Sequence, residues 1–336
     1  MKAWQLKDFG LNNLAFVDVE KPEPGPKDVL VRFEAASVNP RDYQIIMGQF
    51  TPNIDFPLIP VSDGAGTITT IGNDVTELRV GDRVTPLFFP NWHMGEALGD
   101  ERKLSSGLEV PGVLREYGVY REETVVRIPD YLTASEAACL PCAGLTAWTS
   151  LVTIANIQPD NTVLIQGTGG VAIAGLQLSK ALGARVVVIS SRNEKLALAK
   201  ELGADHCINY VKNPEWGIEA FEYAHHGVDA VLEIGGSGTM ANSLTAIRHG
   251  GHIAVIGYMS GIDVGVTVFP LIIKCANLHG IATGNSENYR AMLAFMEKHE
   301  VKPQISAAYS YEEAGKALGD IALGTHFGKI VIDLES

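Results

Sequence analysis

The sequence contains few cysteines and lacks the two paired C-x-x-C motifs of a structural zinc site. Only four cysteines occur in 336 residues: Cys139, Cys142, Cys207 and Cys275. Structural zinc sites and secreted disulfide frameworks need several cysteines at short, repeated spacings. The sequence therefore predicts reduced thiols that act separately.

Positive charge and long apolar runs are also scarce. Lysine and arginine total 26 against 39 aspartates and glutamates, for a formal net charge of −13. Nucleic acids and anionic membranes attract basic surfaces. No run reaches the roughly 18 apolar residues of a membrane span, and the opening MKAWQLKDFG lacks the apolar core of a signal peptide. We expect a cytoplasmic protein with a small-molecule substrate and no nucleic-acid or membrane partner.

The apolar residues follow two different patterns, and 336 residues exceed what one core usually supports. The first third carries short β-branched runs such as DVLVRFEAASV and AGTITTIG, typical of a rolled or barrel-like sheet. Further on, the apolar runs NTVLIQG, ARVVVIS, VDAVLEIG and GHIAVIG are separated by helical stretches, which predicts a parallel sheet covered on both faces. The expected fold class is α/β, with a β-rich domain and a doubly wound parallel sheet.

A glycine-rich turn follows the first of these apolar strands. The sequence VLIQGTGGVAIAG has the G-x-G-x-x-A pattern between a strand and a helix, a context typical of dinucleotide binding. The first glycine permits the tight turn, the second lets the backbone approach a pyrophosphate, and the alanine permits close helix packing. The turn consists of Gly167, Thr168, Gly169, Gly170, Val171 and Ala172.

The end of the next strand indicates which dinucleotide is bound. NAD sites usually place an acidic residue there to bind the ribose hydroxyls. This chain instead reads ISSRNEK, with Ser190, Ser191 and Arg192 at the strand end and Lys195 shortly after. Hydroxyls and a guanidinium suit a 2′-phosphate. We therefore expect NADP(H).

Taken together, the motifs SVNPRD, DGAG, VGDRV, GTGGVA and HFGKIVI resemble the medium-chain dehydrogenase/reductase superfamily in content and order. The resemblance extends over essentially the whole chain. It implies a GroES-like catalytic domain formed by residues 1–143 and 285–336, and a Rossmann dinucleotide-binding domain formed by residues 144–284.

In the zinc-dependent alcohol dehydrogenases of that superfamily, three positions hold a catalytic metal. By resemblance these positions fall on Asn39, Ser62 and Cys142. An amide and a hydroxyl are poor zinc ligands, and Asp63 with Cys142 would hold zinc weakly. We therefore expect no metal, with Asn39 and Ser62 projecting into the catalytic cleft and Cys142 as a neutral thiol.

The resemblance also assigns further residues to the cofactor and suggests a homodimer, with residues 264–280 as the interface or, alternatively, as an internal strand and helix. Arg41, Tyr43 and His93 are additional polar candidates near the substrate, and Asp42 is expected to be structural. The further cofactor residues are Thr146, Tyr210, Gly235, Gly257 and Tyr258.

The zinc-independent branch similar to quinone oxidoreductases fits these features. It implies hydride transfer from NADPH to a quinone, an enone or a related activated carbonyl. Two alternatives remain open: a metal-free NADP-dependent alcohol or aldehyde oxidoreductase, and a non-catalytic NADPH-binding sensor or structural protein. The long, charged segment from residue 91 to 116 is expected to be a loop that covers a site.

Overall fold

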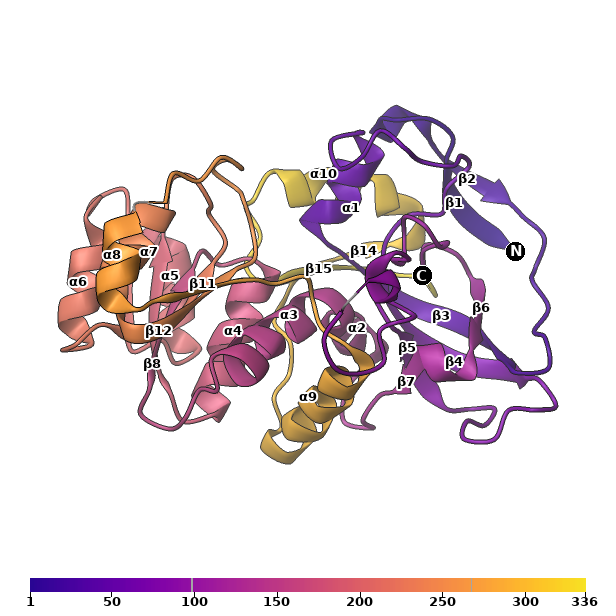
Figure 1. Ribbon diagram of the computed structural model, residues 1–336. Helices are drawn as coiled ribbons and strands as arrows, with labels where there is room; N and C mark the ends of the chain where they lie inside the picture. The colour runs from indigo at the N-terminus through magenta and orange to yellow at the C-terminus, as the bar shows by residue number, and fades with distance from the viewer. Residues whose placement is uncertain (98, 267) are drawn as a thin grey trace. The chain divides into compact units, whose positions relative to one another are not determined.

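The computed structural model describes residues 1–97, 99–266 and 268–336, which divide into two compact units. One unit comprises residues 1–143 and 285–336, and the other comprises residues 144–284. Both chain termini belong to the first unit (Figure 1). Within the described ranges, no helix has the length and apolar character needed to cross a bilayer.

A seven-stranded sheet organises the first unit, with strand order β14-β15-β3-β4-β5-β7 and β6 paired to β3. The long central strand β3 pairs with β15, β4 and β6, and most of its residues are apolar and buried. A separate hairpin joins β1 and β2. The strands are β1 (Lys2–Leu6), β2 (Leu14–Asp18), β3 (Asp28–Val38), β4 (Asp63–Ile71), β5 (Arg83–Pro86), β6 (Tyr117–Arg121), β7 (Val125–Arg127), β14 (Ile305–Ser310) and β15 (Lys329–Asp333).

Four α-helices accompany this sheet. The helix α10 packs on α1, β14 and β15, whereas α2 packs on β3 and β4. The amphipathic stretch SENYRAMLAFMEKHE is the helix α9, as its periodicity predicts. The helices are α1 (Pro40–Ile46), α2 (Ala134–Ala138), α9 (Ser286–His299) and α10 (Ala314–Ala322).

The stretch LPCAGLTAW does not form one regular α-helix. Residues 140–144 and 149–154 form π-helical turns on either side of the short α-helix α3 (Leu145–Trp148). Pro141 has no backbone N–H and therefore cannot donate an ordinary helical hydrogen bond. The wider π turn is compatible with this missing donor.

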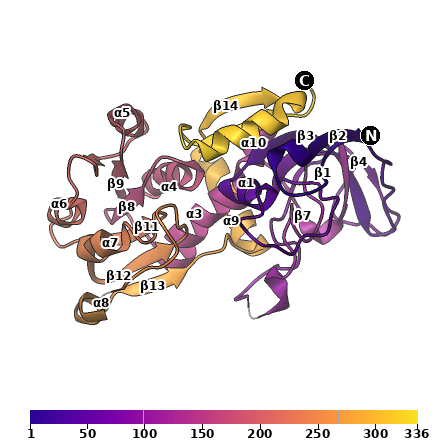
Figure 2. The same ribbon diagram turned by 90° about the horizontal axis from the view of Figure 1, so that it is seen from above.

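The second unit contains a six-stranded parallel sheet with the order β10-β9-β8-β11-β12-β13. Figure 2 shows α4 on one side of these strands and α6 and α7 on the other. The strands are β8 (Thr162–Gln166), β9 (Arg185–Ser190), β10 (His206–Asn209), β11 (Val228–Glu233), β12 (Ile247–Val255) and β13 (Asn277–Gly280). The helices are α4 (Gly170–Ala181), α5 (Asn193–Glu201), α6 (Trp216–Tyr223), α7 (Met240–Ala246) and α8 (Val268–Lys274).

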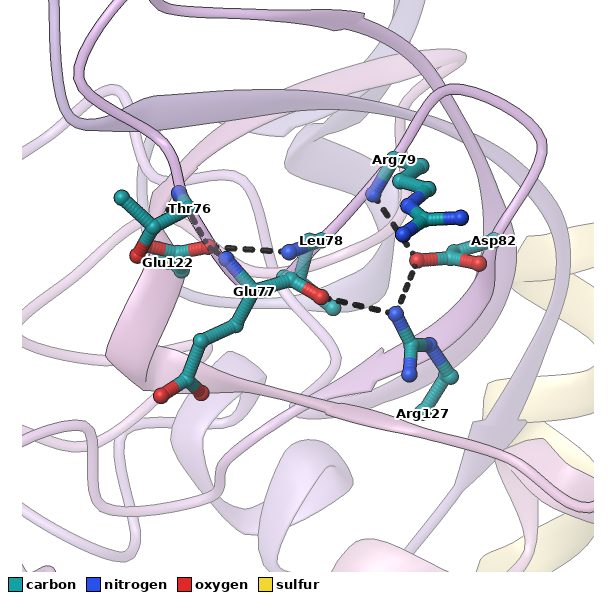
Figure 3. Close-up of polar contacts among 7 residues, drawn as sticks. All are labelled: Thr76, Glu77, Leu78, Arg79, Asp82, Glu122 and Arg127. Carbon is teal, nitrogen blue, oxygen red and sulfur yellow. Dashed lines mark hydrogen bonds and ion pairs between the residues drawn. The ribbon is translucent and has the colours of Figure 1, made fainter.

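A polar network holds the turn between β4 and β5 against the rest of the first unit (Figure 3). The Glu122 carboxylate accepts backbone hydrogen bonds from Thr76, Glu77 and Leu78 at 3.0, 2.6 and 2.9 Å. Burial by itself would raise the pKa of Glu122, but these three amides lower it. Arg127 donates to the Glu77 carbonyl oxygen at 2.8 Å. The turn is therefore stabilised by a charged carboxylate.

We predict that Glu122→Gln lowers stability by about 1 kcal/mol at pH 7, because charge-assisted hydrogen bonds are lost at a solvent-screened site. The folded-state pKa lies below the ordinary value of 4.5. The advantage of the natural protein is thus complete above that value and disappears as the pH falls through the lowered pKa. Thermal unfolding at pH 7 and pH 3 tests this. Glu77→Gln is the control, since its carboxylate points away from Glu122 (Figure 3). An E122Q deficit of equal size at both pH values would contradict the prediction.

Candidate active site

The glycine-rich turn lies between β8 and α4, at the carboxyl end of the parallel strand. Gly167 has φ of +76°, a conformation that glycine adopts without strain. Its N–H donates to the Ile189 carbonyl oxygen at 2.8 Å and so joins the ends of β8 and β9. The helix α4 begins at Gly170, and the N–H groups of a first helical turn are the usual binding partners of a phosphate. The geometry fits a dinucleotide pyrophosphate.

Close packing of α4 on the sheet depends on more than the alanine of the motif. Ala172 is buried, as its small size suggests. A Cβ added at Gly175 would lie 2.6 Å from Leu232 Cδ2, so this glycine makes the tighter approach. The sequence signal was present in GVAIAGLQ, three residues beyond the motif.

The residues expected beside the adenosine phosphate gather at the ends of β9 and β10. Ser190 is buried, and its carbonyl oxygen accepts a hydrogen bond from the Tyr210 N–H at 3.2 Å. Ser191 and Arg192 are exposed, and Tyr210 is 41% exposed. Burial and the neighbouring Arg192 charge lower the pKa of Lys195. Ser191, Arg192, Lys195 and Tyr210 thus form an accessible edge of basic and hydroxyl groups, and Ser190 is buried beside them.

A buried carboxylate organises the turn that follows β11. Glu233 is 0% exposed and accepts hydrogen bonds from the N–H groups of Gly235 and Gly236 at 3.1 and 2.9 Å. Gln166, at the end of β8, donates to Glu233 at 2.7 Å and accepts from the Gly235 N–H at 3.0 Å. Thr239 and Ser243 donate their hydroxyl protons to the same carboxylate. Sequence reasoning identified Gly235 but missed the side chains that hold it.

Two other expected cofactor residues follow β12. The Gly257 N–H donates to the Glu233 carbonyl oxygen at 3.2 Å, and a Cβ at Gly257 would lie 2.6 Å from the Ile234 carbonyl oxygen. Tyr258 is 45% exposed. Thr146 is buried in α3, and its carbonyl oxygen accepts a hydrogen bond from the Ser150 hydroxyl at 2.8 Å. The hydrogen bond between Gly257 and Glu233 therefore holds the loops after β11 and β12 together at the carboxyl edge of the sheet.

In the first unit, the structure brings Asn39 and Ser62 together in a buried cluster. Asn39 Nδ2 lies 3.4 Å from Ser62 Oγ, and Ser62 Oγ donates to Asp63 Oδ1 at 2.7 Å. The other Asp63 oxygen accepts from the Cys142 N–H at 3.1 Å. Asn39 and Ser62 are 4% and 0% exposed, so both are part of a packed polar network.

Asp42 ties together the backbone at the two positions. Its carboxylate accepts from the Asn39 N–H at 2.7 Å and from the Ser62 N–H at 3.3 Å. Burial raises the pKa of Asp42 to about 6, with Arg41 acting in the opposite direction. These contacts agree with the structural role expected for Asp42.

The residue before Ser62 has a strained backbone. Val61 has φ of +71°, which is an outlier for a β-branched residue. Its carbonyl oxygen accepts from the Val113 N–H at 2.8 Å, and the close approach of Gly112 leaves no room for a side chain there. Such strain is held in place by surrounding contacts and is concentrated at functional sites. It supports a functional role for this cluster.

The buried lysine of β15 completes the cluster and was missed by sequence reasoning. Lys329 Nζ donates to Asn39 Oδ1 at 2.6 Å and to the Val38 carbonyl oxygen at 2.8 Å, and the residue is 5% exposed. Burial raises the pKa of Asp63, whereas Lys329, Asn39 and Ser62 act in the opposite direction. The only available signal was a lysine inside the apolar run HFGKIVI.

Burial also affects the protonation of the Cys142 thiol. Burial and then the Asp63 carboxylate raise the pKa of the Cys142 thiol far above its ordinary value. A neutral thiol is a weak nucleophile and a weak metal ligand. The expectation of a neutral thiol agrees with these surroundings.

The first part of the 91–116 segment is attached to α9. The carbonyl oxygens of Trp92 and His93 accept hydrogen bonds from the N–H groups of Ser286 and Glu287, both at 3.0 Å. The His93 side chain is exposed. The segment thus caps a helix through its backbone, and His93 remains a solvent-facing residue.

The later part of the segment is held by Arg41. Its guanidinium donates to the Ser106 carbonyl oxygen at 3.0 Å and to the Ser105 hydroxyl. The same guanidinium lies over the rings of Phe50 and Phe88, at 5.3 and 4.8 Å from their centroids. Arg41 therefore anchors this loop beside Asp42.

Two family models match the chain, one for each unit. The model described as an alcohol dehydrogenase GroES-like domain matches residues 25–130, and that described as a zinc-binding dehydrogenase matches residues 170–298. The chain belongs to the medium-chain dehydrogenase/reductase superfamily. Members of this superfamily are oxidoreductases that bind NAD or NADP, and the α/β fold class predicted from the sequence is confirmed.

Individual relatives of this medium-chain dehydrogenase/reductase carry different names. The zinc-type alcohol dehydrogenase-like protein C1773.06c of Schizosaccharomyces pombe is 34% identical, covering 97% of this chain and 96% of its own. The 2-methylene-furan-3-one reductase of Solanum lycopersicum is 29% identical, covering 99% and 79%. A solved structure from Sinorhizobium meliloti 1021, which bears the name alcohol dehydrogenase, has a TM-score of 0.94 and 37% identity over 99% of this chain and 98% of that chain.

Zinc does not fit the side chains of this superfamily member. Catalytic zinc sites use three histidine, cysteine or carboxylate ligands. Here Asn39 and Ser62 offer an amide and a hydroxyl that are already hydrogen-bonded, which leaves Cys142 as the one usual zinc-ligand type at the three positions. Across the described portions of the chain, no three His, Cys, Asp or Glu side chains are grouped so that they could hold a metal.

The buried Glu233 network gives a prediction about this unit. Glu233→Gln keeps the shape but replaces one acceptor oxygen with an N–H₂ group that faces other donors. We expect a loss of about 2 kcal/mol, because buried donors are left without a partner. Thermal unfolding measures the loss, with exposed Glu222→Gln on α6 as the control. Equal unfolding temperatures for the two variants would contradict the role assigned to Glu233.

Proposed function

We propose that this protein is a metal-independent, NADPH-dependent oxidoreductase that transfers hydride to a quinone, an enone or a related activated carbonyl compound. The observation that carries the proposal is the buried cluster in which Asn39 and Ser62, which by resemblance occupy two of the metal-ligand positions, contact Lys329 and Asp63. An amide and a hydroxyl, both hydrogen-bond donors, stand at these two positions in place of ligands. The chemistry must then be one that hydrogen bonds can assist.

Activated carbonyl compounds meet that requirement. Hydride addition to an enone or quinone places negative charge on oxygen, and preorganised donors stabilise such charge. The conjugated system is electron-poor, so it accepts hydride without the stronger polarisation that a metal supplies. The name of the tomato relative, 2-methylene-furan-3-one reductase, is that of an enzyme acting on an enone.

The accessible edge at β9 and β10 supports NADPH as the donor. Ser191, Arg192 and Tyr210 offer hydroxyls and a guanidinium to a 2′-phosphate. When bound, NADPH supplies the hydride. Gly167 and the first turn of α4 would hold the pyrophosphate, and the loops after β11 and β12 would hold the nicotinamide side.

Reversible alcohol or aldehyde oxidoreduction with NADP is the second candidate. Several relatives are named alcohol dehydrogenase, including the Sinorhizobium meliloti protein. A non-catalytic NADPH-binding role is the third candidate, and it predicts cofactor binding without turnover of any carbonyl compound or alcohol.

Turnover assays with matched acceptors test the proposal. We expect NADPH oxidation with a quinone and an enone, and far slower reaction with a saturated aldehyde. Arg192→Ala should raise the KM for NADPH roughly tenfold by removing a charge-assisted contact, and should leave the KM for NADH unchanged. Lys200→Ala, at the other end of α5, is the control. Equal KM values for NADPH in R192A and K200A would overturn the cofactor assignment.

We also infer a homodimer formed through the second unit. The helix α8 exposes a continuous apolar surface, and an exposed apolar patch of this kind is typical of an interaction site. Phe269, Ile272 and Ile273 are 71%, 63% and 54% exposed. The adjacent β13 is an edge strand of the sheet, so its free side could pair with a second copy.

Sedimentation velocity tests the dimer. Phe269→Glu should convert the dimer to a monomer, because it places a charge in an apolar interface. Leu198→Glu on α5, where the side chain is 43% exposed, is the control and should leave the dimer intact. A monomeric natural protein, or an F269E variant that remains dimeric, would contradict this interface.

A further inference from the structure

The proposed function leaves the charge of Lys329 without a role. Its ammonium is buried and donates to two oxygens, the Val38 carbonyl at 2.8 Å and Asn39 Oδ1 at 2.6 Å. The carboxyl group of Asp63 lies in the same cluster, where burial raises its pKa and the Lys329 charge acts in the opposite direction. A lysine buried in this manner is uncommon and needs such partners.

The lysine determines the orientation of the Asn39 amide. An ammonium group has donor protons and no acceptor, so it can only face the oxygen of the amide. The opposite orientation would place the NH₂ group against the NH₃⁺ group. Asn39 Nδ2 is therefore directed toward Ser62 and Asp63.

Asn39 and Ser62 differ in the length of the hydrogen bonds that they donate. The single hydroxyl proton of Ser62 is donated to Asp63 in a short contact of 2.7 Å. The Asn39 Nδ2 contact with Ser62 Oγ is 3.4 Å, longer than the usual N–H···O distance. Donor contacts in a free enzyme are often long and are improved only when substrate binds. Of the two Nδ2 protons, one serves Asp63, whereas the one that faces Ser62 is only weakly held and is the proton available to a substrate.

The Lys329 ammonium also makes the Asn39 amide a stronger hydrogen-bond donor. Hydrogen bonds in a chain polarise one another in a low-dielectric interior. A cation hydrogen-bonded to Oδ1 draws electron density toward the oxygen and makes the Nδ2 protons more acidic. The positive charge that a metal would supply directly is transmitted here through an amide.

We propose that Lys329 is a positioning residue that orients and polarises the Asn39 amide, and that Asn39 Nδ2 donates the hydrogen bond to the substrate's carbonyl oxygen. This inference rests on the proposed function. It separates two residues that sequence reasoning treated alike: Asn39 contacts the substrate, whereas Ser62 joins Asn39 to Asp63.

Three variants test the assignment with a series of para-substituted aryl vinyl ketones and NADPH. Asn39→Asp keeps an oxygen for Lys329 but removes the amide donor, Lys329→Met removes the charge at similar length, and Ser62→Ala removes only the hydroxyl. We expect kcat to fall about 100-fold in N39D and K329M, because removal of one hydrogen-bond donor to a developing oxyanion typically has an effect of this size. In S62A we expect kcat to fall less than about tenfold.

The dependence on ketone reactivity separates catalysis from a structural defect. When an oxyanion donor is lost, the less electrophilic ketones suffer more, so the slope of log kcat against the substituent constant becomes steeper in N39D and K329M. A defect in folding lowers all rates by one factor and also lowers the unfolding temperature. A steeper slope in S62A alone would assign the donor to Ser62, and parallel slopes in K329M would reduce Lys329 to a structural role. Either result overturns the proposal.

A second measurement is independent of turnover. The side-chain amide signals that vanish from the ¹⁵N NMR spectrum in N39D belong to Asn39. In K329M these signals should shift and exchange faster with solvent. Unchanged Asn39 signals in K329M would overturn the positioning role. If the natural protein reduces no ketone or quinone but the signals respond as expected, the proposed function fails while the Lys329–Asn39 orientation stands.

Discussion

The hydrogen bond from Lys329 to Asn39 is the interaction on which the catalytic unit depends. It joins the first residue of β15 to the residue that precedes α1, which are 290 positions apart in the chain. Because a buried ammonium must be paired, the oxygens of Val38 and Asn39 have to lie at that point. The orientation of the Asn39 amide and its contact with Ser62 follow from this pairing.

In the second unit, the hydrogen-bond partners that buried Glu233 requires determine the conformation of the turn after β11. Glu233 is buried, and neutral groups donate to its oxygens: the amides of Gly235 and Gly236 and the hydroxyls of Thr239 and Ser243. This fixes the glycine turn after β11 at the sheet edge where open α/β sheets bind ligands. In each unit, therefore, a buried charged group determines the backbone of a functional loop.

Sequence patterns predicted the elements that are regular and well buried. The runs VLIQ, RVVVIS and VDAVLE are β8, β9 and β11, because a strand covered on both faces needs apolar residues throughout. The edge strand β10 escaped prediction since it is short and carries polar residues, whereas β13 and α8 lie in the stretch 264–280, for which a strand and a helix were one of two alternatives. The π turns around Cys142 were missed because no periodicity distinguishes them from an α-helix.

The sequence predicted the site residues only where they stand close together in the chain. The G-x-G-x-x-A turn and the SSR end of β9 are contiguous motifs, and their residues do gather at one sheet edge. Lys329 and Glu233 act through partners that the fold brings from distant positions, so a single sequence gives no sign of the pairing. The replacement of two ligand residues was visible, but the buried lysine that contacts Asn39 was not.

Metal analysis of the purified enzyme tests the central claim, that hydrogen-bond donors replace a metal in this protein, most directly. Zinc content is measured alongside enone reduction by NADPH, before and after dialysis against 1,10-phenanthroline. We predict substoichiometric zinc and an unchanged kcat after dialysis. Zinc bound at one equivalent per chain, with activity that is lost on its removal and restored on its return, would contradict this account.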